Sequence, residues 1–447
     1  MNYDAAVRYL LSLGRELAAP THAAAAKFDL ENITVLSERL GRPDRAYPSA
    51  HIAGTNGKGS TAAFLESILR HAGFHTGLNT SPHLEKINER IRVNAEEISD
   101  RDFADTLTRI QAQIEELLAA GQLRAHPTYF ECVTSMAFEY FARVQIGFGV
   151  FEVGLGGRLD ATNILTPAIS LITRVDFDHE NFLGHSLREI ATEKAGILKP
   201  GVQVVLAAQQ LEAREVILAR ARELNCPVIE TPLAYRVDEQ VMKNGCVQAR
   251  ITEIASRWSA RLAPQLAGRF QLQNAINAVA AARALSARGY RIPENAMEQG
   301  VATAVWPGRL EKLQSRPDIY VDGAHNPGAA RELDAFWEEN FAGRRIFLLY
   351  GALRDKAVDE IAGALFPRAC EVVFTEPRTS RAISASQLSE IAAHHAAHSS
   401  VIADAEHALD YLLSKAGPQD AVFVTGSLYL VGQLRHYWKQ RAQVAAR

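Results

Sequence analysis

Short apolar runs alternate with longer amphipathic stretches along the chain. In the first 300 residues, runs rich in Val, Ile and Phe stand at 49–54, 147–154, 169–176, 202–208 and 227–230. Between them lie stretches whose apolar residues recur every three or four positions, such as the one at 58–72. Strands that alternate with helices in this way are typical of βαβ units, so the pattern predicts a largely parallel sheet.

The same alternation restarts after residue 300, with apolar runs at 319–325, 345–353, 371–377, 399–404 and 421–427. The segment just before this restart contains Pro307 and Gly308, which interrupt helices and strands. We therefore predict an α/β protein of two domains. Residues 1–298 are expected to form a domain with a mostly parallel sheet, and residues 299–447 a smaller Rossmann-like domain. The less regular stretch near 230–262 is expected to form a hairpin.

The composition is that of an ordinary globular protein, with 47% hydrophobic and 22% charged residues. With 48 basic and 51 acidic side chains, the net charge of −3 gives no overall attraction to nucleic acid or an anionic membrane. No apolar run approaches the roughly 20 residues that span a bilayer. Residues 1–17 carry charges in a helical period, which favours a folded helix over a signal peptide. The four cysteines form no CxxC pair, which argues against a disulfide framework or a structural zinc site. We expect a cytoplasmic monomer.

A glycine-rich segment with one lysine follows the first apolar run and opens a helical pattern. Its residues are Gly54, Thr55, Asn56, Gly57, Lys58, Gly59 and Ser60. A strand, a glycine-rich turn and a helix N-terminus together form the usual setting of a phosphate-binding loop. The match to GxxxxGK[ST] is imperfect, because Ile52 replaces the first glycine and Gly59 separates the lysine from the serine. The alternative is a glycine-rich turn with an incidental lysine.

Acidic and imidazole side chains stand at the ends of two later apolar runs. Glu152 ends a buried run, where an isolated carboxylate is costly, so it is expected to bind a cation such as Mg²⁺. The alternative is an ion pair with Arg158. Asp176, Asp178 and His179 end the next run. Because ligands bind beyond the carboxyl ends of parallel strands, we expect this group to face the same crevice as Lys58. His179 could be a metal ligand, a proton carrier or a structural imidazole, and we favour a functional role.

Three further sequence features do not by themselves indicate a functional site. The glycines of GLGGRL do not form GxGxxG, because Leu159 stands at the last position, so no NAD site is expected. Lys194 lies on a predicted helix that ends before Pro200, and the pattern alone indicates a solvated lysine. His394 and His398 have the spacing of one helix face, and without an acidic partner nearby in sequence they indicate a solvated surface rather than a metal site.

Nine segments occur together in an order that resembles one family. They are GTNGKGST at 54–61, SPHL at 81–84, NERI at 88–91, TYFE at 128–131, EVGLGGRLDATN at 152–163, DH followed by LG within 178–184, EKAGI at 193–197, PGR at 307–309 and DGAHNP at 322–327. This set resembles the folylpolyglutamate synthase and dihydrofolate synthase branch of the Mur ligase superfamily. The resemblance implies the Mur ligase architecture, in which residues 1–298 form a phosphate-loop ATPase-like domain. It also implies an ATP-dependent ligase. Such an enzyme adds L-glutamate to dihydropteroate, to a reduced folate, or to both, through an acyl phosphate.

The resemblance also implies roles for individual residues. One or two Mg²⁺ ions would be held by Ser81, Glu152 and His179, with Lys194 carbamylated and helping to hold the second ion. Lys58, His179 and Lys194 would be catalytic. ATP would contact the 54–60 loop together with Asn274, Arg309, Asp322 and His325. The folate or pteroate would contact Asp29, Leu30, Glu31, Ser81, Pro82, His83, Thr128, Tyr129, Phe130, Glu131, Leu159, Asp160 and Ala161.

Three alternatives stay open. The first is a folylpolyglutamate synthase that does not act on dihydropteroate. The second is a cell-wall ligase that acts on a UDP-linked precursor, against which the SPHL, NERI and TYFE segments and the lack of a recognisable UDP-binding domain argue. The third is a nucleotide-gated binding protein without ligase activity, which has no need for Glu152, His179 and Lys194 together.

Overall fold

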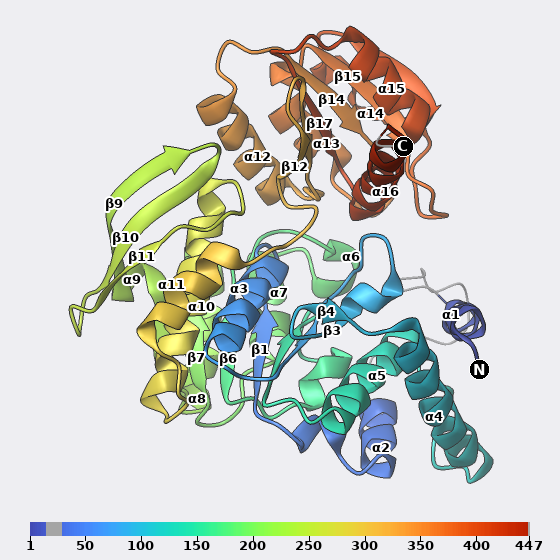
Figure 1. Ribbon diagram of the computed structural model, residues 1–447. Helices are drawn as coiled ribbons and strands as arrows, with labels where there is room; N and C mark the ends of the chain where they lie inside the picture. The colour runs from blue at the N-terminus through green and yellow to red at the C-terminus, as the bar shows by residue number, and fades with distance from the viewer. Residues whose placement is uncertain (15–28, 446–447) are drawn as a thin grey trace.

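Two large sheets and one small sheet organise the chain (Figure 1). The computed structural model describes residues 1–14 and 29–445. The first large sheet has eight strands in the order β4-β3-β2-β5-β1-β6-β7-β8. Its strands from β2 to β8 run parallel, and β3 and β4 are antiparallel additions at one edge. The predicted mostly parallel sheet is therefore confirmed.

The strands of this sheet are β1 (Ser49–Ala53), β2 (Thr76–Asn79), β3 (Ile91–Val93), β4 (Glu96–Glu97), β5 (Phe148–Glu152), β6 (Ile169–Ile172), β7 (Gln203–Leu206) and β8 (Val228–Glu230). Its helices are α1 (Tyr3–Ser12), α2 (Glu31–Arg39), α3 (Lys58–His71), α4 (Asp100–Ala119), α5 (Tyr129–Arg143), α6 (Glu180–Leu183), α7 (Leu187–Ala195), α8 (Leu211–Glu223), α9 (Thr231–Ala234), α10 (Arg269–Ala287) and α11 (Glu294–Thr303). The helix predicted at 58–72 is present, and the helix predicted over residues 1–17 is present as α1; residues 15–17 of that prediction lie outside the described residues.

Helices cover both faces of the first sheet, which explains why its strands are continuously apolar. In β5, Phe148 and Val150 pack in the core formed with α3, α10 and α11. Phe151, on the opposite face, packs with Phe138 and Phe141 of α5. β2 did not stand out in the sequence because its four residues include a glycine and two polar side chains.

The stretch predicted as a hairpin is an antiparallel sheet of three strands, β9 (Tyr235–Lys243), β10 (Cys246–Glu253) and β11 (Ser259–Leu262). It projects to one side of the first domain (Figure 1). Alternate residues of β10, namely Val247, Ala249 and Ile251, are buried in the core that contains α10. The hairpin prediction is therefore confirmed and extended by one strand.

The second large sheet has the order β12-β13-β17-β14-β15-β16, parallel except for β12. Its strands are β12 (Glu311–Gln314), β13 (Asp318–Val321), β14 (Ile346–Tyr350), β15 (Glu371–Glu376), β16 (Ser399–Asp404) and β17 (Ala421–Thr425). Its helices are α12 (Pro327–Asn340), α13 (Val358–Leu365), α14 (Ala385–Ala392), α15 (Ala405–Lys415) and α16 (Leu428–Ala445). Phe423 of β17 packs with Tyr320, Trp337 and Phe341 on one face, and its neighbours Val422 and Val424 pack on the other.

The division predicted between residues 298 and 299 falls within α11. Met297 and Val301 of α11 are buried in the core of the first domain. We propose that the boundary lies in the segment 304–310, which joins α11 to β12.

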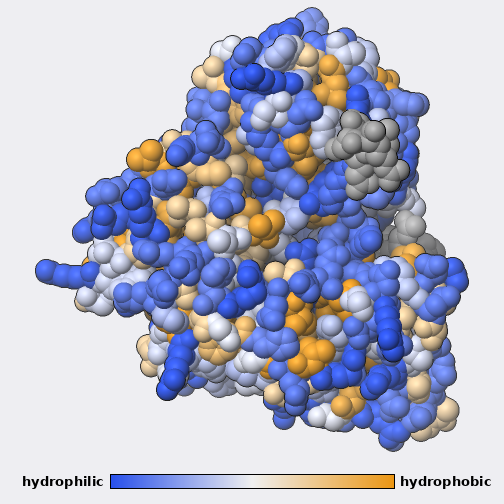
Figure 2. Space-filling model, viewed as in Figure 1, coloured by the Kyte–Doolittle hydropathy of each residue, from blue (hydrophilic) through white to orange (hydrophobic). Residues whose placement is uncertain are grey.

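The face of the molecule in Figure 2 is largely hydrophilic, with apolar residues scattered among polar ones. In the described part of the chain, no helix has both the length and the apolar character needed to cross a membrane.

Candidate active site

The carboxyl ends of strands from both large sheets border one cavity of about 450 Å³. The first domain contributes the segments that follow β1, β5 and β6, and the second contributes the segment that follows β13. The predicted residues that line the cavity are Gly54, Thr55, Asn56, Gly57, Lys58, Gly59, Ser60, Ser81, Pro82, Glu152, Asp178, His179, Lys194, Asn274, Arg309, Asp322 and His325. Residues that are far apart in the sequence are thus gathered at one place between the two domains.

The segment 54–60 forms the loop that the sequence predicts between β1 and α3. Gly57 stands at the N-terminus of α3 with a φ of 89°, which is the left-handed region that favours glycine. A Cβ atom there would lie 2.3 Å from the Asn274 side-chain oxygen. The backbone N–H groups of Thr55 and Asn56 both donate to the Arg174 carbonyl, at 2.8 and 3.1 Å. The loop is therefore held from the β6 side and approached closely by α10.

Lys58 points its amine back onto its own loop. Its Nζ donates to the carbonyls of Gly54 and Thr55, at 3.1 and 3.2 Å. Burial lowers the pKa of this amine, with Arg309 acting in the same direction and Glu152 opposing it. Among the described residues, no carboxylate lies within ion-pair distance of its Nζ, so the charge is available to an anionic ligand in the cavity.

Glu152 is the last residue of β5 and is 5% exposed. One of its oxygens accepts the Ser81 backbone N–H at 3.2 Å. The alternative of an ion pair with Arg158 is wrong, because Arg158 pairs with Glu193 at 2.9 Å instead. Burial raises the pKa of the Glu152 carboxyl, while the positive charge of Lys58 opposes the rise. A buried carboxylate that faces a cavity and has no direct cationic partner in the described part of the chain suits a bound cation.

The group after β6 divides into two parts. Asp178 and His179 line the cavity as predicted, but Asp176 does not, so that part of the prediction is wrong. Asp176 is buried beside the phosphate loop, where its backbone exchanges hydrogen bonds with the Thr55 hydroxyl at 2.9 and 3.0 Å. Its side chain faces Arg331 at 3.5 Å. Asp176 therefore stabilises the phosphate loop through its backbone and does not contact a ligand in the cavity.

His179 is a neutral imidazole, because burial lowers its pKa to about 3 even though Asp178 opposes the shift. Its Nδ1 atom is buried and has no hydrogen-bond partner among the described residues. An Asp355 carboxylate oxygen lies 3.7 Å from this atom, across the domain boundary. An unpaired lone pair or N–H that faces a cavity is what a metal ligand or a substrate contact requires.

Lys194 is buried, not solvated, so the interpretation from its sequence pattern alone is wrong. It is 4% exposed on α7, and its Nζ donates to the Gly54 carbonyl at 2.8 Å. Burial and the nearby Lys58 lower its pKa to about 7. In the described ranges no carboxylate lies within ion-pair distance of this amine. The amine is therefore partly unprotonated near neutral pH.

The second domain adds Arg309, Asp322 and His325 to the cavity wall. The Asp322 carboxylate accepts the backbone N–H groups of Leu310 and Ala324, both at 2.8 Å, so it shapes the loop that carries the other two residues. Burial raises the pKa of this carboxyl. His325 donates through Nδ1 to the Gly323 carbonyl at 2.7 Å, which leaves Nε2 facing Asp178 at 3.4 Å.

The residues predicted for folate binding lie in two places. Ser81 and Pro82 line the cavity. Another group adjoins its wall: Phe130 packs against Gly154, where an added Cβ would lie 2.5 Å from the ring. Arg90, which is buried, lies over the Tyr129 ring at 5.5 Å and donates to His83 at 2.8 Å.

Several of the residues predicted to bind folate also stabilise the local structure. Thr128 and Glu131 form a capping box at the start of α5, so TYFE is also a helix-start signal. Asp160 accepts the backbone N–H groups of Gly154, Leu155 and Thr162 and thereby fixes the 154–162 loop, in which Leu159 and Ala161 are its neighbours. The Asp29 carboxylate accepts the Glu31 backbone N–H at 2.9 Å, and Leu30 between them is the N-cap of α2.

Sequence reasoning missed the residues by which the second domain meets this site. Asn326 exchanges amide hydrogen bonds with Asn56 of the phosphate loop, at 2.9 and 3.2 Å. Lys356 donates to Asp178 at 2.6 Å and has a side chain that is 5% exposed. Lys356 follows β14 in the sequence GALRDK, so its position at the carboxyl end of a predicted strand was the signal that could have identified it.

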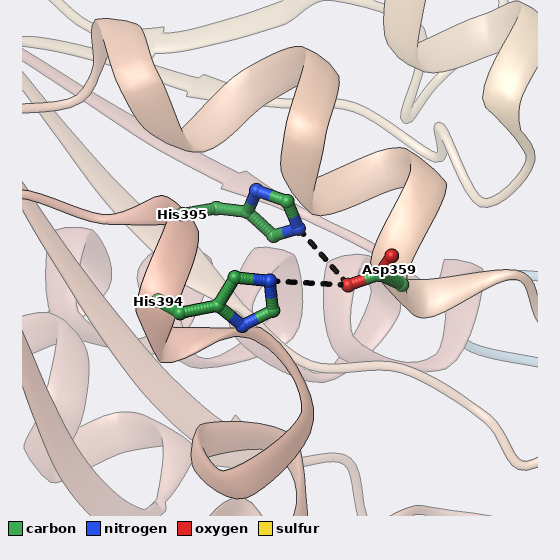
Figure 3. Close-up of side chains that lie close together, drawn as sticks. All are labelled: Asp359, His394 and His395. Atoms are coloured by element: carbon green, nitrogen blue, oxygen red, sulfur yellow. Dashed lines mark hydrogen bonds and ion pairs between the residues drawn. The ribbon is translucent and has the colours of Figure 1, made fainter.

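The histidines near residue 395 do not lie on one helix face, so that expectation is wrong. α14 ends at Ala392, and Ala393–His395 form one 3-10 turn before β16. His394 and His395 instead point toward Asp359, with Nε2 atoms 3.5 and 2.9 Å from the same carboxylate oxygen (Figure 3). Asp359 is far away in sequence, which explains why no acidic partner was expected. None of the three lines the cavity.

Comparison with known proteins agrees with this arrangement. The family model for the Mur ligase middle domain matches residues 52–282, and the model for the Mur ligase, glutamate ligase domain matches residues 308–428. The chain is 36% identical over 408 residues to the dihydrofolate synthase/folylpolyglutamate synthase of Bacillus subtilis, which covers 90% of this chain and 92% of that relative. The chain belongs to the Mur ligase family. Within it, the chain falls in the folylpolyglutamate synthase and dihydrofolate synthase branch.

Solved structures from this branch have the same fold as this Mur ligase. The Mycobacterium tuberculosis folylpolyglutamate synthase complexed with ADP and AMPPCP superposes with a TM-score of 0.87 at 29% identity, covering 98% of this chain and 99% of that one. Escherichia coli FolC in complex with DHPP and ADP superposes with a TM-score of 0.86 at 27% identity, covering 99% of both chains.

Replacing Lys58 by alanine is expected to weaken nucleotide binding without unfolding the protein. Loss of a charge-assisted hydrogen bond costs about 1.5–3 kcal/mol, which corresponds to roughly 10- to 100-fold in affinity. Calorimetric titration with ADP measures the loss, and circular dichroism checks the fold. Lys243→Ala, an exposed lysine on β9, is the control and should bind ADP like the wild type. Unchanged ADP affinity in folded Lys58→Ala would contradict the phosphate-loop assignment.

Proposed function

We propose that this Mur ligase uses ATP to join L-glutamate to dihydropteroate and to reduced folates. The observation that supports this most strongly is the meeting of Lys58, Glu152 and Lys194 in one cavity between two domains. A nucleotide sensor needs the first of these but has no evident use for a buried carboxylate and a second buried amine. We also propose that the protein is a cytoplasmic monomer; its four free cysteines fit a reducing compartment.

The reaction begins with transfer of the terminal phosphate of ATP to the carboxylate of the pteroate or folate. This step brings two anions together, so it needs fixed positive charge at the meeting point. Lys58, Arg309 and the N-terminus of α3 supply such charge from the cavity wall. The amine of glutamate then attacks the acyl phosphate, and phosphate leaves as the amide forms. Holding the three reactants together in one cavity lowers the activation barrier by roughly 7–11 kcal/mol.

The acyl phosphate is destroyed if water reaches it, so the site must be closed during the reaction. Contacts between the domains surround the cavity: Asn56 with Asn326, and Asp178 with both Asn326 and Lys356. These residues join the phosphate loop and the end of β6 to the second domain. We propose that the joined arrangement excludes water from the intermediate.

The donor atoms around the cavity fit Mg²⁺. Glu152 presents a buried carboxylate, and His179 has a buried Nδ1 without a hydrogen-bond partner among the described residues. Glu152, His179, the Ser81 hydroxyl and a modified Lys194 would hold one or two ions. When bound, Mg²⁺ would neutralise phosphate charge and orient the phosphate groups.

The surroundings of Lys194 support the carbamylation that the family resemblance implies. A buried ammonium with one carbonyl partner and a second amine nearby is costly, which is why its pKa falls to about 7. The unprotonated amine reacts with carbon dioxide to form a carbamate, and the released proton leaves to solvent. The product is an anion beside Lys58, so the modification converts a repulsive pair of cations into an attractive ion pair and supplies oxygen ligands for Mg²⁺.

The activity is tested by measuring ADP release from purified protein with ATP, Mg²⁺ and glutamate, and with either dihydropteroate or tetrahydrofolate as acceptor. We expect ADP and an equal amount of glutamylated product with both acceptors. Release with tetrahydrofolate alone would identify a folylpolyglutamate synthase. ADP binding without product from either acceptor would favour a nucleotide-gated binding protein.

Replacing Glu152 by glutamine is expected to raise the Mg²⁺ concentration needed for half-maximal activity by at least about tenfold. The amide keeps the shape of the side chain but loses the charge that a hard cation prefers, and even residues that only orient a metal ligand contribute about 10- to 100-fold to affinity. Glu230→Gln is the matched control, since Glu230 also ends a parallel strand but pairs with Arg214. If the Mg²⁺ concentration for half-maximal activity is unchanged in Glu152→Gln, Glu152 has only a structural role.

Replacing Lys194 by alanine is expected to abolish nearly all activity, and added formate or acetate should restore part of it. The small acid would fill the vacated space and present the oxygens that the carbamate supplies. Lys194→Arg should be inactive, because its guanidinium cannot be carbamylated. Incubation with ¹³C-bicarbonate should give a carbamate carbon signal in the wild type that is absent from both variants.

Lys199→Ala is the matched control for this experiment. Lys199 is also a partly buried lysine whose amine donates to one carbonyl, that of Asn163 at 2.8 Å, but it does not line the cavity. Its replacement should leave the carbamate signal intact and give no rescue by acids. An active Lys194→Arg variant together with no ¹³C signal in the wild type would reject carbamylation.

A further inference from the structure

Trp306 lies in the 304–310 segment between the domains and touches the phosphate loop directly. A Cβ atom built on Gly59 would lie 2.8 Å from the indole Nε1 and 3.0 Å from both Cε2 and Cζ2. Real Cβ atoms do not come this close to a neighbour, so the contact is possible only because residue 59 has no side chain. The edge of the indole therefore rests on the loop backbone between Lys58 and Ser60.

A second contact joins the indole to β3 of the first large sheet. The Arg92 guanidinium of β3 lies over the Trp306 ring, 5.3 Å from its centroid. Arg92 is itself fixed by a hydrogen bond from its Nε to the Glu89 carbonyl at 3.1 Å. Trp306 is therefore in contact with both the phosphate loop and the sheet edge.

The indole also borders a small space beside the candidate magnesium ligands. This second cavity, of about 30 Å³, is lined by Gly59, Ser81, Glu152, Trp306 and Arg309 among others. Its volume suits one or two water molecules. Moving the indole would open this space toward Glu152 and remove the support under the Gly59 backbone.

We infer that Trp306 is a positioning residue that holds the phosphate loop in its ligand-binding shape through Gly59. The loop shape then depends on the segment that joins the domains, because the supporting ring belongs to that segment. This accounts for the departure from the common phosphate-loop pattern, in which Ser or Thr directly follows the lysine. A side chain at position 59 would displace the indole. The inference rests on the proposed phosphate-binding role of the 54–60 loop.

The first test is a double-mutant cycle on ADP affinity, measured by calorimetry. Trp306→Ala and Gly59→Ala should each weaken ADP binding by about tenfold or more. The double variant should be no weaker than either single variant, because both changes break the same contact. Trp306→Phe should retain most of the affinity. In steady-state kinetics, Trp306→Ala should raise the KM for ATP and leave the KM for glutamate unchanged.

The second test uses tryptophan fluorescence and does not depend on the alanine variants folding. ADP should change the emission of the wild type, and this change should vanish in Trp306→Phe. Trp258→Phe is the matched control, since Trp258 also stacks with an arginine, Arg283 at 4.1 Å, but does not line either cavity. It should keep the full ADP-dependent change.

The inference would be overturned by additive effects of Gly59→Ala and Trp306→Ala on ADP affinity, by an unchanged fluorescence response in Trp306→Phe, or by near-normal ADP binding in Trp306→Ala. These results are distinguishable from failure of the phosphate-loop assignment. If Lys58→Ala binds ADP normally, the assignment itself is wrong. If Lys58→Ala loses affinity while Trp306→Ala binds within about twofold of the wild type, the loop assignment stands and only the role of Trp306 is refuted.

Discussion

Two lysine amines donate to one carbonyl oxygen of the phosphate loop, and the rest of the site depends on how their positive charge is neutralised. Lys58 and Lys194 both donate to the Gly54 carbonyl, at 3.1 and 2.8 Å. Neither has a carboxylate within ion-pair distance among the described residues, so protein groups do not neutralise this positive charge directly. A site of this kind attracts anions and favours chemistry that removes a positive charge. Phosphate groups satisfy the first condition, and a carbamate on Lys194 satisfies the second.

The parallel topology explains how the other groups reach the same place. Glu152 ends β5, Asp178 and His179 follow β6, and Lys356 follows β14 of the other sheet. Since the carboxyl ends of parallel strands meet at one edge, two facing sheets bring anions, cations and imidazoles together without any long loop. The Lys356–Asp178 ion pair crosses this junction with both side chains less than 10% exposed. Separating the domains would break this buried pair and leave Lys356, among the described residues, only its longer contact with Asp355, at 3.6 Å, which favours the closed arrangement.

A site residue could be predicted from the sequence only where its neighbours in the structure are also its neighbours in the sequence. The strand-loop-helix around Lys58 is contiguous, so its context could be recognised, and Glu152 was identifiable because a carboxylate in an apolar run is costly. Lys194 looked solvated because its helix pattern gives no sign that Gly54, 140 residues earlier, lies against it. Asp359 could not be joined to His394 for the same reason. TYFE was assigned to a ligand although its Thr128 and Glu131 also form a helix cap, a second reading that the sequence contains.

The glycines of the phosphate loop show how a local motif depends on distant elements. A Cβ at Gly54 would lie 1.9 Å from the Thr173 hydroxyl oxygen after β6, and one at Gly57 would meet Asn274 of α10. The Gly59 backbone, in turn, lies against the segment that joins the domains. Each glycine thus marks the approach of a different element, and together they hold the loop on three sides. Flexible glycines alone would give a loop of many shapes, at an entropic cost for ordering on each binding event. Contacts on three sides lower that cost before a ligand arrives, which is how a glycine-rich segment becomes a preorganised anion site.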